Sequence, residues 1–213
     1  MSVERMPLDL KQSLEKLAKE KAPGPNPSFS TFHFLLAIEL IAEKPIGRNK
    51  IAHELGIGEG ATRTLIRRLK EEGLTSISKA GCTLTKKGLE LWKEYGSIIK
   101  KTRIEKNELT FAEYSFAVLV KKSGHKVGTG MEQRDAAIVA GARGATTILF
   151  KKGLLVFPAV ERNLKKDFPK ASNQIARLLK PQEDDTIIVV SSDDHAKAEH
   201  GALAAAWTLV DCD

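Results

Sequence analysis

Residues 48–74 read RNKIAHELGIGEGATRTLIRRLKEEGL, and this stretch decides the fold of the first half of the chain. Apolar side chains recur at helical spacing in two short segments, at about 48–55 and 59–72. Between them, Gly56 can adopt the positive φ that ends a helix, because glycine has no Cβ to obstruct it. The stretch therefore predicts two helices joined by a tight turn, with one apolar side of the second helix buried.

The flanking segments extend this unit. An amphipathic helix is expected at 8–21, followed by a breaker rich in proline at 22–27 and a buried helix at 30–43. Beyond the opening stretch, β-branched residues at 74–85 surround a glycine-containing turn and predict a hairpin. Thr85 closes that hairpin, and we expect it to cap a further helix.

This order of helix, turn, helix and hairpin resembles the winged helix-turn-helix domain of bacterial and archaeal transcription regulators. The motifs that carry the resemblance are Ile51-Ala52, Leu55-Gly56-Ile57, the helix from Glu59, RLKEEGL at 68–74 and LTKKGL at 84–89. The resemblance covers about residues 30–100 and implies a DNA-binding domain whose second helix enters the major groove. The chain departs from the usual pattern at Gly58, where a serine commonly caps this helix, and at Thr62, where an aliphatic residue is common.

The side of the second helix opposite its apolar residues is expected to meet DNA. Arg63 and Thr64 are the candidates for base contact, because arginine can donate two hydrogen bonds to guanine and threonine offers a hydroxyl and a methyl group. Glu59 would repel phosphates unless it accepts a hydrogen bond from a cytosine amino group. Cations of the helices and the hairpin are candidates for phosphate contact. The predicted DNA-binding residues are Arg48, Lys50, Glu59, Gly60, Arg63, Thr64, Arg67, Arg68, Lys79 and Lys86, with Lys87 beside them.

The charge distribution indicates a polyanion partner for the first half. The chain has 213 residues, with 34 Lys and Arg against 27 Asp and Glu and a net charge of +7. Residues 1–108 hold 20 basic and 14 acidic side chains, whereas residues 109–213 hold 14 and 13. Residues 48–88 alone hold 9 basic and 4 acidic side chains, so the basic excess lies on the predicted helices and hairpin. A hydrophobic content of 42% excludes a disordered chain.

The charged segment 100–110 is where we place a domain boundary. It divides the chain into a DNA-binding domain at 1–108 and an effector-binding or dimerisation domain at 109–213. In the second half the elements follow the order β-α-β-β-α-β-α. The predicted fold class is α+β, a winged helix followed by a small α/β sandwich. The first six elements of the sandwich match the ferredoxin-like order βαββαβ, with a short doubly wound sheet as the alternative. This half resembles the C-terminal domains of uncharacterised archaeal regulators.

Two loops of the second half lie where ligands commonly bind, at strand ends and helix starts. Their backbone N–H groups could hold an anion, or their side chains could merely cap the helices. The candidate ligand-binding residues are Thr129, Gly130, Arg134, Ser192, Asp193 and Asp194. No metal site is expected, although His195 and Glu199 form an i, i+4 pair that a metal could join. No catalytic motif is present, so we expect neither an enzyme nor a cofactor.

These observations predict a sequence-specific, DNA-binding transcription regulator. The expected partners are double-stranded DNA, a small-molecule effector and a second copy of the chain, because regulators of this fold usually read two half-sites. The helices at 8–21 and 92–99 are the candidate dimer elements. Three alternatives stay open: a small-molecule-binding protein or enzyme that uses its winged helix for protein contacts, a metal-responsive regulator, and a basic protein of RNA or chromatin.

The location expected from sequence is the cytoplasm. No apolar run approaches the length of a membrane span, and residues 1–12 lack the apolar segment of a signal peptide. Cys82 and Cys212 have no spacing typical of zinc or redox sites, so both are expected to be reduced, inert thiols.

Overall fold

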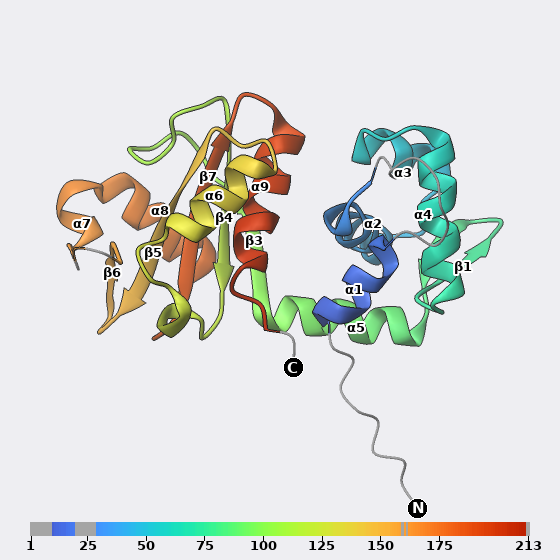
Figure 1. Cartoon of the computed structure of the whole chain (residues 1–213), viewed down its shortest axis with the longest axis horizontal. Helices are drawn as coiled ribbons and strands as arrows, with labels where there is room; N and C mark the ends of the chain where they lie inside the picture. The colour runs from blue at the N-terminus through green and yellow to red at the C-terminus, as the bar shows by residue number, and fades with distance from the viewer. Residues whose placement is uncertain (1–9, 20–28, 159, 161, 212–213) are drawn as a thin grey trace, which may run out of the picture. The chain divides into compact units, whose positions relative to one another are not determined.

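The computed structural model describes residues 10–19, 29–158, 160 and 162–211 (Figure 1). Its contacts divide the chain into two compact units, one ending at Gly96 and the other spanning Ser97–Val210. The predicted breaker at 22–27 and Cys212 lie outside the described residues. Within the described ranges, no helix combines the length and the apolar character that crossing a bilayer requires.

The first unit contains helices and one short hairpin, in the order that the sequence predicts. Its elements are α1 (Leu10–Ala18), α2 (Thr31–Glu43), α3 (Arg48–Leu55), α4 (Glu59–Glu71), β1 (Thr75–Ser78), β2 (Gly81–Leu84) and α5 (Lys86–Ile98). Gly56 ends α3 with φ of 63°, which confirms its expected left-handed conformation. The hydroxyl of Thr85 accepts a hydrogen bond from the N–H of Gly88 at 3.1 Å, so Thr85 caps α5 as expected.

The core of the first unit forms around α2, which contacts α1, α3 and β2. Leu10, Leu14 and Leu17 of α1 are all buried in this unit. Because its apolar side is covered within the chain, α1 offers no apolar face to a second copy, contrary to expectation. The predicted dimer element at 92–99 is also divided, since Ile99 is buried and begins a strand of the second unit.

The second unit is built on one five-stranded sheet with helices on both faces. Its elements are β3 (Ile99–Arg103), β4 (Tyr114–Val120), a 3-10 turn at Gly124–Lys126, α6 (Met131–Val139), β5 (Gly144–Lys151), β6 (Leu154–Val156), α7 (Leu164–Asp167), α8 (Pro169–Leu179), β7 (Thr186–Ser192) and α9 (His195–Trp207). The strand order is β3-β4-β7-β5-β6, and every neighbouring pair is antiparallel.

This topology confirms the α+β class and corrects its details. β4 and β5 are both antiparallel to β7, which lies between them, so the split βαβ unit is present. In the ferredoxin-like order the inserted strand would be the third one, here β6. Instead β6 folds back along the outer edge of β5, and the last strand, β7, fills the gap. The antiparallel pairings also contradict the doubly wound alternative.

The predicted boundary at 108/109 is displaced because part of the charged segment is a strand. Ile99 and Arg103 of β3 pair with Val120 and Phe116 of β4, so this strand belongs to the sheet of the second unit. The contact boundary therefore falls after Gly96.

Helices cover both faces of the sheet (Figure 1). On one face, α9 contacts β4, β7 and α6, and α6 contacts β5. Gly201 allows this close packing, because a Cβ there would lie 2.7 Å from the Cβ of Ala142. On the other face, Ile175 and Leu179 of α8 join Leu119 and Ile187 of the sheet in one apolar cluster. The small residues of α9 thus pack within their own unit.

Candidate nucleic-acid interface

The helix α4 separates a buried side from an exposed one. Leu65, Ile66 and Leu69 are at most 1% exposed and face the core of the first unit. Arg63 and Arg67 lie on the opposite, exposed side, one helical turn apart. No side chain caps the helix, since its N-cap is Gly58. The first turn of α4 therefore presents backbone and few side-chain atoms, which allows another molecule to approach closely.

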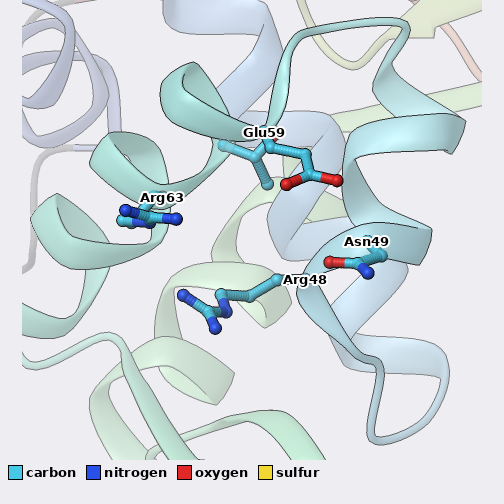
Figure 2. A pocket seen from close by; sticks show the side chains of 5 residues that line it. Arg48, Asn49, Glu59 and Arg63 are labelled. Carbon is cyan, nitrogen blue, oxygen red and sulfur yellow. The ribbon is translucent and has the colours of Figure 1, made fainter.

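A small pocket joins this exposed side to the start of α3. It is lined by Arg48, Asn49, Glu59, Thr62 and Arg63. Figure 2 shows Arg48 and Asn49 from α3, and Glu59 and Arg63 from α4, around this pocket. The structure thus brings together two arginines that stand 15 positions apart in the sequence, with one carboxylate beside them. Such a group can bind an anion or read a base edge.

The hairpin of β1 and β2 carries further cations. Lys79 is exposed at its tip, and Lys86 is exposed at the start of α5. The two strands are held in register by a hydrogen bond of 2.8 Å between the hydroxyls of Ser76 and Thr83. Close to the turn, β2 is also held by Ile46, which pairs with Cys82 through backbone hydrogen bonds. Burial raises the pKa of the Cys82 thiol, so this side chain stays protonated at neutral pH.

Arg68 does not belong to this surface, and its assignment to phosphate contact is wrong. Its side chain is buried, with 7% of the residue exposed. One guanidinium nitrogen, Nη1, donates hydrogen bonds to the carbonyl oxygens of Leu17 at 2.7 Å and Lys19 at 2.9 Å. The guanidinium also lies 5.3 Å from the centre of the Phe29 ring. Arg68 therefore ties α4 to the end of α1 and to the segment before α2.

Other predicted residues are exposed but partly engaged. Arg67 forms an ion pair of 3.4 Å with Glu71, one turn further along α4. An exposed pair of this kind contributes little, so the Arg67 guanidinium remains available to a stronger anion. The Thr64 hydroxyl donates to the carbonyl of Gly60 at 3.2 Å. Lys87 donates to the carbonyl of Glu72 at 2.8 Å, at the end of α4.

The ligand-binding residues predicted in the second unit are not brought together. Gly130 lies at the start of α6, where a Cβ would meet Thr147 at 2.8 Å. Asp193 lies beyond the other end of α6 and pairs with Arg143 at 2.7 Å. Asp194 caps α9 by accepting the N–H of Lys197. The two loops are thus at opposite ends of α6, so Thr129, Gly130 and Arg134 do not share one site with Ser192, Asp193 and Asp194, and ligand binding at either loop stays a prediction.

His195 and Glu199, the i, i+4 pair that a metal could join, each contact other residues of the second unit. Glu199 forms an ion pair with the largely buried Lys101 of β3. His195 packs edge-on against the rings of Tyr114 and Phe116. Among the described residues, no three His, Cys, Asp or Glu side chains form a group that could hold a metal ion. Burial lowers the pKa of nearby His200, which keeps this imidazole neutral at pH 7.

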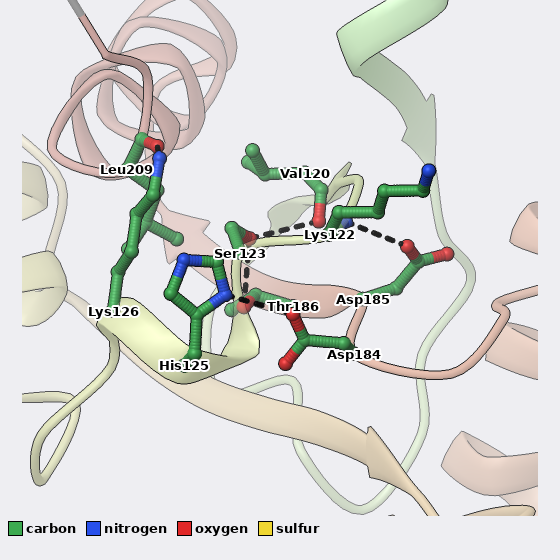
Figure 3. Close-up of polar contacts among 9 residues, drawn as sticks. All are labelled: Val120, Lys122, Ser123, His125, Lys126, Asp184, Asp185, Thr186 and Leu209. Atoms are coloured by element: carbon green, nitrogen blue, oxygen red, sulfur yellow. Dashed lines mark hydrogen bonds and ion pairs between the residues drawn. The ribbon is translucent and has the colours of Figure 1, made fainter.

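Polar groups in the turn after β4 and at the start of β7 form hydrogen bonds with one another (Figure 3). Asp185 accepts the N–H groups of Lys122 at 3.0 Å and Gln182 at 2.8 Å. The hydroxyl of Ser123 lies 2.9 Å from both the Val120 carbonyl oxygen and the Thr186 hydroxyl. These contacts fix the turn after β4, which accounts for the cluster without a ligand.

A larger pocket lies at the segment where the sequence predicted a domain boundary and at the residues just after it. Its volume is about 520 Å³, within the range of small-molecule sites. None of the predicted ligand-binding residues lines it. The lining residues are Ile104, Lys106, Thr110, Phe111, Ala112, Glu113 and Ser115. Phe111 is 54% exposed, and its ring covers Gly144, where a Cβ would lie 3.1 Å from the ring. The sequence signal that could have indicated this pocket is Phe111, an aromatic residue in a charged loop.

Comparisons with known proteins agree with the division into two parts. Residues 32–90 match the family model "PH0730-like, N-terminal domain", and residues 111–209 match "Domain of unknown function (DUF4443)". The solved structure of the hypothetical protein PH0730 from Pyrococcus horikoshii OT3 is similar, with 28% identity and a TM-score of 0.71. The match covers 85% of this chain and 93% of that one. The comparison with curated proteins gives no match.

Proposed function

We propose that the chain is a sequence-specific DNA-binding transcription regulator whose first unit is a winged helix. In this proposal α4 is the recognition helix, and the hairpin of β1 and β2 is the wing. The observation that carries the proposal is the pairing of Arg63 on α4 with Arg48 on α3 around one exposed pocket. The opposite side of α4 is buried, so the helix has a single face that can meet a partner.

The positions of the exposed cations support a duplex partner. An α-helix fits the major groove, which is about 12 Å wide, and cations on either side of it then reach the phosphates. Glycines at the start of α4 let its backbone approach the base edges. The exposed cations of this surface, hereafter the basic face, are Arg48, Lys50, Arg63, Arg67, Lys79 and Lys86.

Selection of genomic DNA fragments on the full chain, followed by a salt titration of the best fragment, tests this proposal. We expect enrichment of a defined sequence. If about five of the cations neutralise phosphates, log K should fall against log salt with a slope of about −4 to −5 per bound copy.

Two results would contradict the proposal. Binding without a preferred sequence, removed entirely by salt, would indicate a general basic protein of RNA or chromatin. The absence of DNA binding at low salt would indicate that the first unit contacts proteins instead. A shuffled fragment of the same length is the matched control, because it retains the phosphates but not the sequence.

A small-molecule effector is the second part of the proposal, supported by the pocket beside Phe111. Lys106, Phe111 and Glu113 are among the residues that line this pocket. A cation, a carboxylate and an apolar surface together suit a zwitterion with an apolar side chain, such as a free amino acid. Bound effector would change DNA affinity only by binding the DNA-competent state with a different affinity.

Thermal unfolding in the presence of apolar amino acids, with nucleotides as the comparison series, tests this pocket. A compound present at 100 times its Kd should stabilise the second unit by about 2.7 kcal/mol. Phe111→Ala should abolish the shift, whereas Leu178→Ala, at an exposed apolar residue outside the pocket lining, should preserve it. A shift that survives Phe111→Ala, or no shift with any amino acid, would contradict the assignment.

A further inference from the structure

Glu59 is the one acidic residue that lines the pocket of the basic face. Its side chain is exposed at the first position of α4, one helical turn before Arg63. Within the described residues, the Glu59 carboxylate forms no hydrogen bond and no ion pair, although Arg48 and Arg63 line the same pocket. The carboxylate is therefore available to a partner.

The other polar groups of the pocket limit what that partner can be. Thr62 is 1% exposed, and its hydroxyl donates to the Gly58 carbonyl at 3.1 Å, so it offers the pocket no free donor. Arg48 and Arg63 bring positive charge, which attracts phosphate, whereas the Glu59 carboxylate repels it. A face that bound only phosphate would be weakened by this carboxylate. The combination instead suits the edges of bases, which offer donors as well as acceptors.

Cytosine is the base that matches the Glu59 carboxylate. In the major groove cytosine presents an amino donor, whereas guanine presents two acceptors and thymine presents an acceptor and a methyl group. Adenine also has an amino group, but the N7 acceptor beside it repels a carboxylate. Residues about one turn apart on a recognition helix contact neighbouring base pairs, as they do in zinc fingers. The guanine that Arg63 would contact therefore has a second G·C pair beside it.

We propose that Glu59 is a specificity-determining residue of the DNA site, and that it selects cytosine at the base pair next to the guanine read by Arg63. The inference rests on the proposed function, because it names part of the sequence that α4 would read. It predicts two adjacent G·C pairs in the selected DNA. The carboxylate also discriminates against other duplexes, since it repels phosphate wherever no cytosine amino group meets it.

Binding of the full chain to the selected fragment and to its single base-pair variants, at constant salt, tests this inference. The position of interest is the neighbour of the base pair whose preference Arg63→Ala relaxes. In the parent, replacing cytosine there should weaken binding at least about fivefold, the lower end for one base contact. In Glu59→Ala the same replacement should change the affinity less than about twofold. This variant should also bind a shuffled fragment more tightly than the parent, because a charge that repels phosphate is gone.

Glu59→Gln supplies the decisive comparison. A carboxamide has a donor as well as an acceptor, and it pairs with adenine through N6 and N7. The preference at this one base pair should therefore change from cytosine to adenine, while the preference for guanine at the Arg63 position is retained. Damage to the fold lowers the affinity for every sequence and does not exchange one preferred base for another.

Glu54→Gln is the matched control, since it removes an exposed carboxylate from α3, outside the pocket lining. It should leave the preferred base unchanged at every position. If Glu59 only stabilises the start of α4 through the helix dipole, Glu59→Gln should lower the Tm and retain the cytosine preference. That result, or a selected sequence without cytosine at this position, would overturn the inference and leave the proposed function intact. A parent without any preferred sequence would overturn both.

Discussion

Replacing both Arg48 and Arg63 with alanine should weaken binding of the selected DNA about a hundredfold or more. A bidentate arginine contact to guanine contributes about 1–3 kcal/mol of discrimination, and loss of a phosphate contact adds to this. The two side chains come from different helices but line one pocket, so the double variant removes the centre of the basic face. Neither residue is buried, and we expect the fold to be unchanged. Fluorescence anisotropy at constant salt measures the loss.

The single variants separate base reading from phosphate binding. Arg63→Ala should weaken binding to the selected sequence and relax the preference at one base pair. Arg48→Ala should weaken all sequences about equally and reduce the magnitude of the salt slope by about one. Lys93→Ala, which removes an exposed cation from α5, is the matched control and should change the affinity little. Equal affinity of the parent and the double variant would show that α4 is not the recognition helix.

The helices of the first unit could be predicted because local chemistry determines their bounds. Gly56 ends α3 by its left-handed backbone, and Thr85 begins α5 by its hydroxyl. The buried side of α4 follows from the spacing of Leu65, Ile66 and Leu69. Each of these signals involves residues within one or two helical turns, so the sequence alone contains them.

The features that sequence reasoning missed depend on distant partners. β3 has charged residues at most positions, as exposed edge strands often do, and only its pairing with β4 makes it a strand. Likewise, the pattern of β5 and β6 predicts a hairpin but not the side of β5 on which β6 lies. That choice is made when β7, from the end of the chain, enters between β4 and β5. The pocket beside Phe111 was missed for the same reason, since part of the segment that lines it was interpreted as a domain boundary.

Arg68→Ala should destabilise the first unit by about 3 kcal/mol, a large effect for one substitution. A hydrogen bond to a charged group contributes about 1.5–3 kcal/mol, and here one nitrogen donates to two backbone carbonyls. Their loss, with that of the contact to Phe29, leaves the buried carbonyl group of Leu17 without this donor. Hydrogen exchange of the amides in α2 and α4 measures this unit apart from the other.

The neighbouring arginine is the matched control, because Arg67 is exposed and Arg68 is buried on the same helix. Arg67→Ala should change the stability of the unit by less than about 0.5 kcal/mol, since exposed ion pairs contribute little. At a temperature where both variants are folded, only Arg67→Ala should reduce DNA affinity. The opposite result, with Arg68→Ala stable but weakly bound, would return Arg68 to the basic face. Burial thus separates the two adjacent arginines: Arg68 holds α4 against the rest of the unit, and we expect the exposed Arg67 to be the one that reaches phosphate.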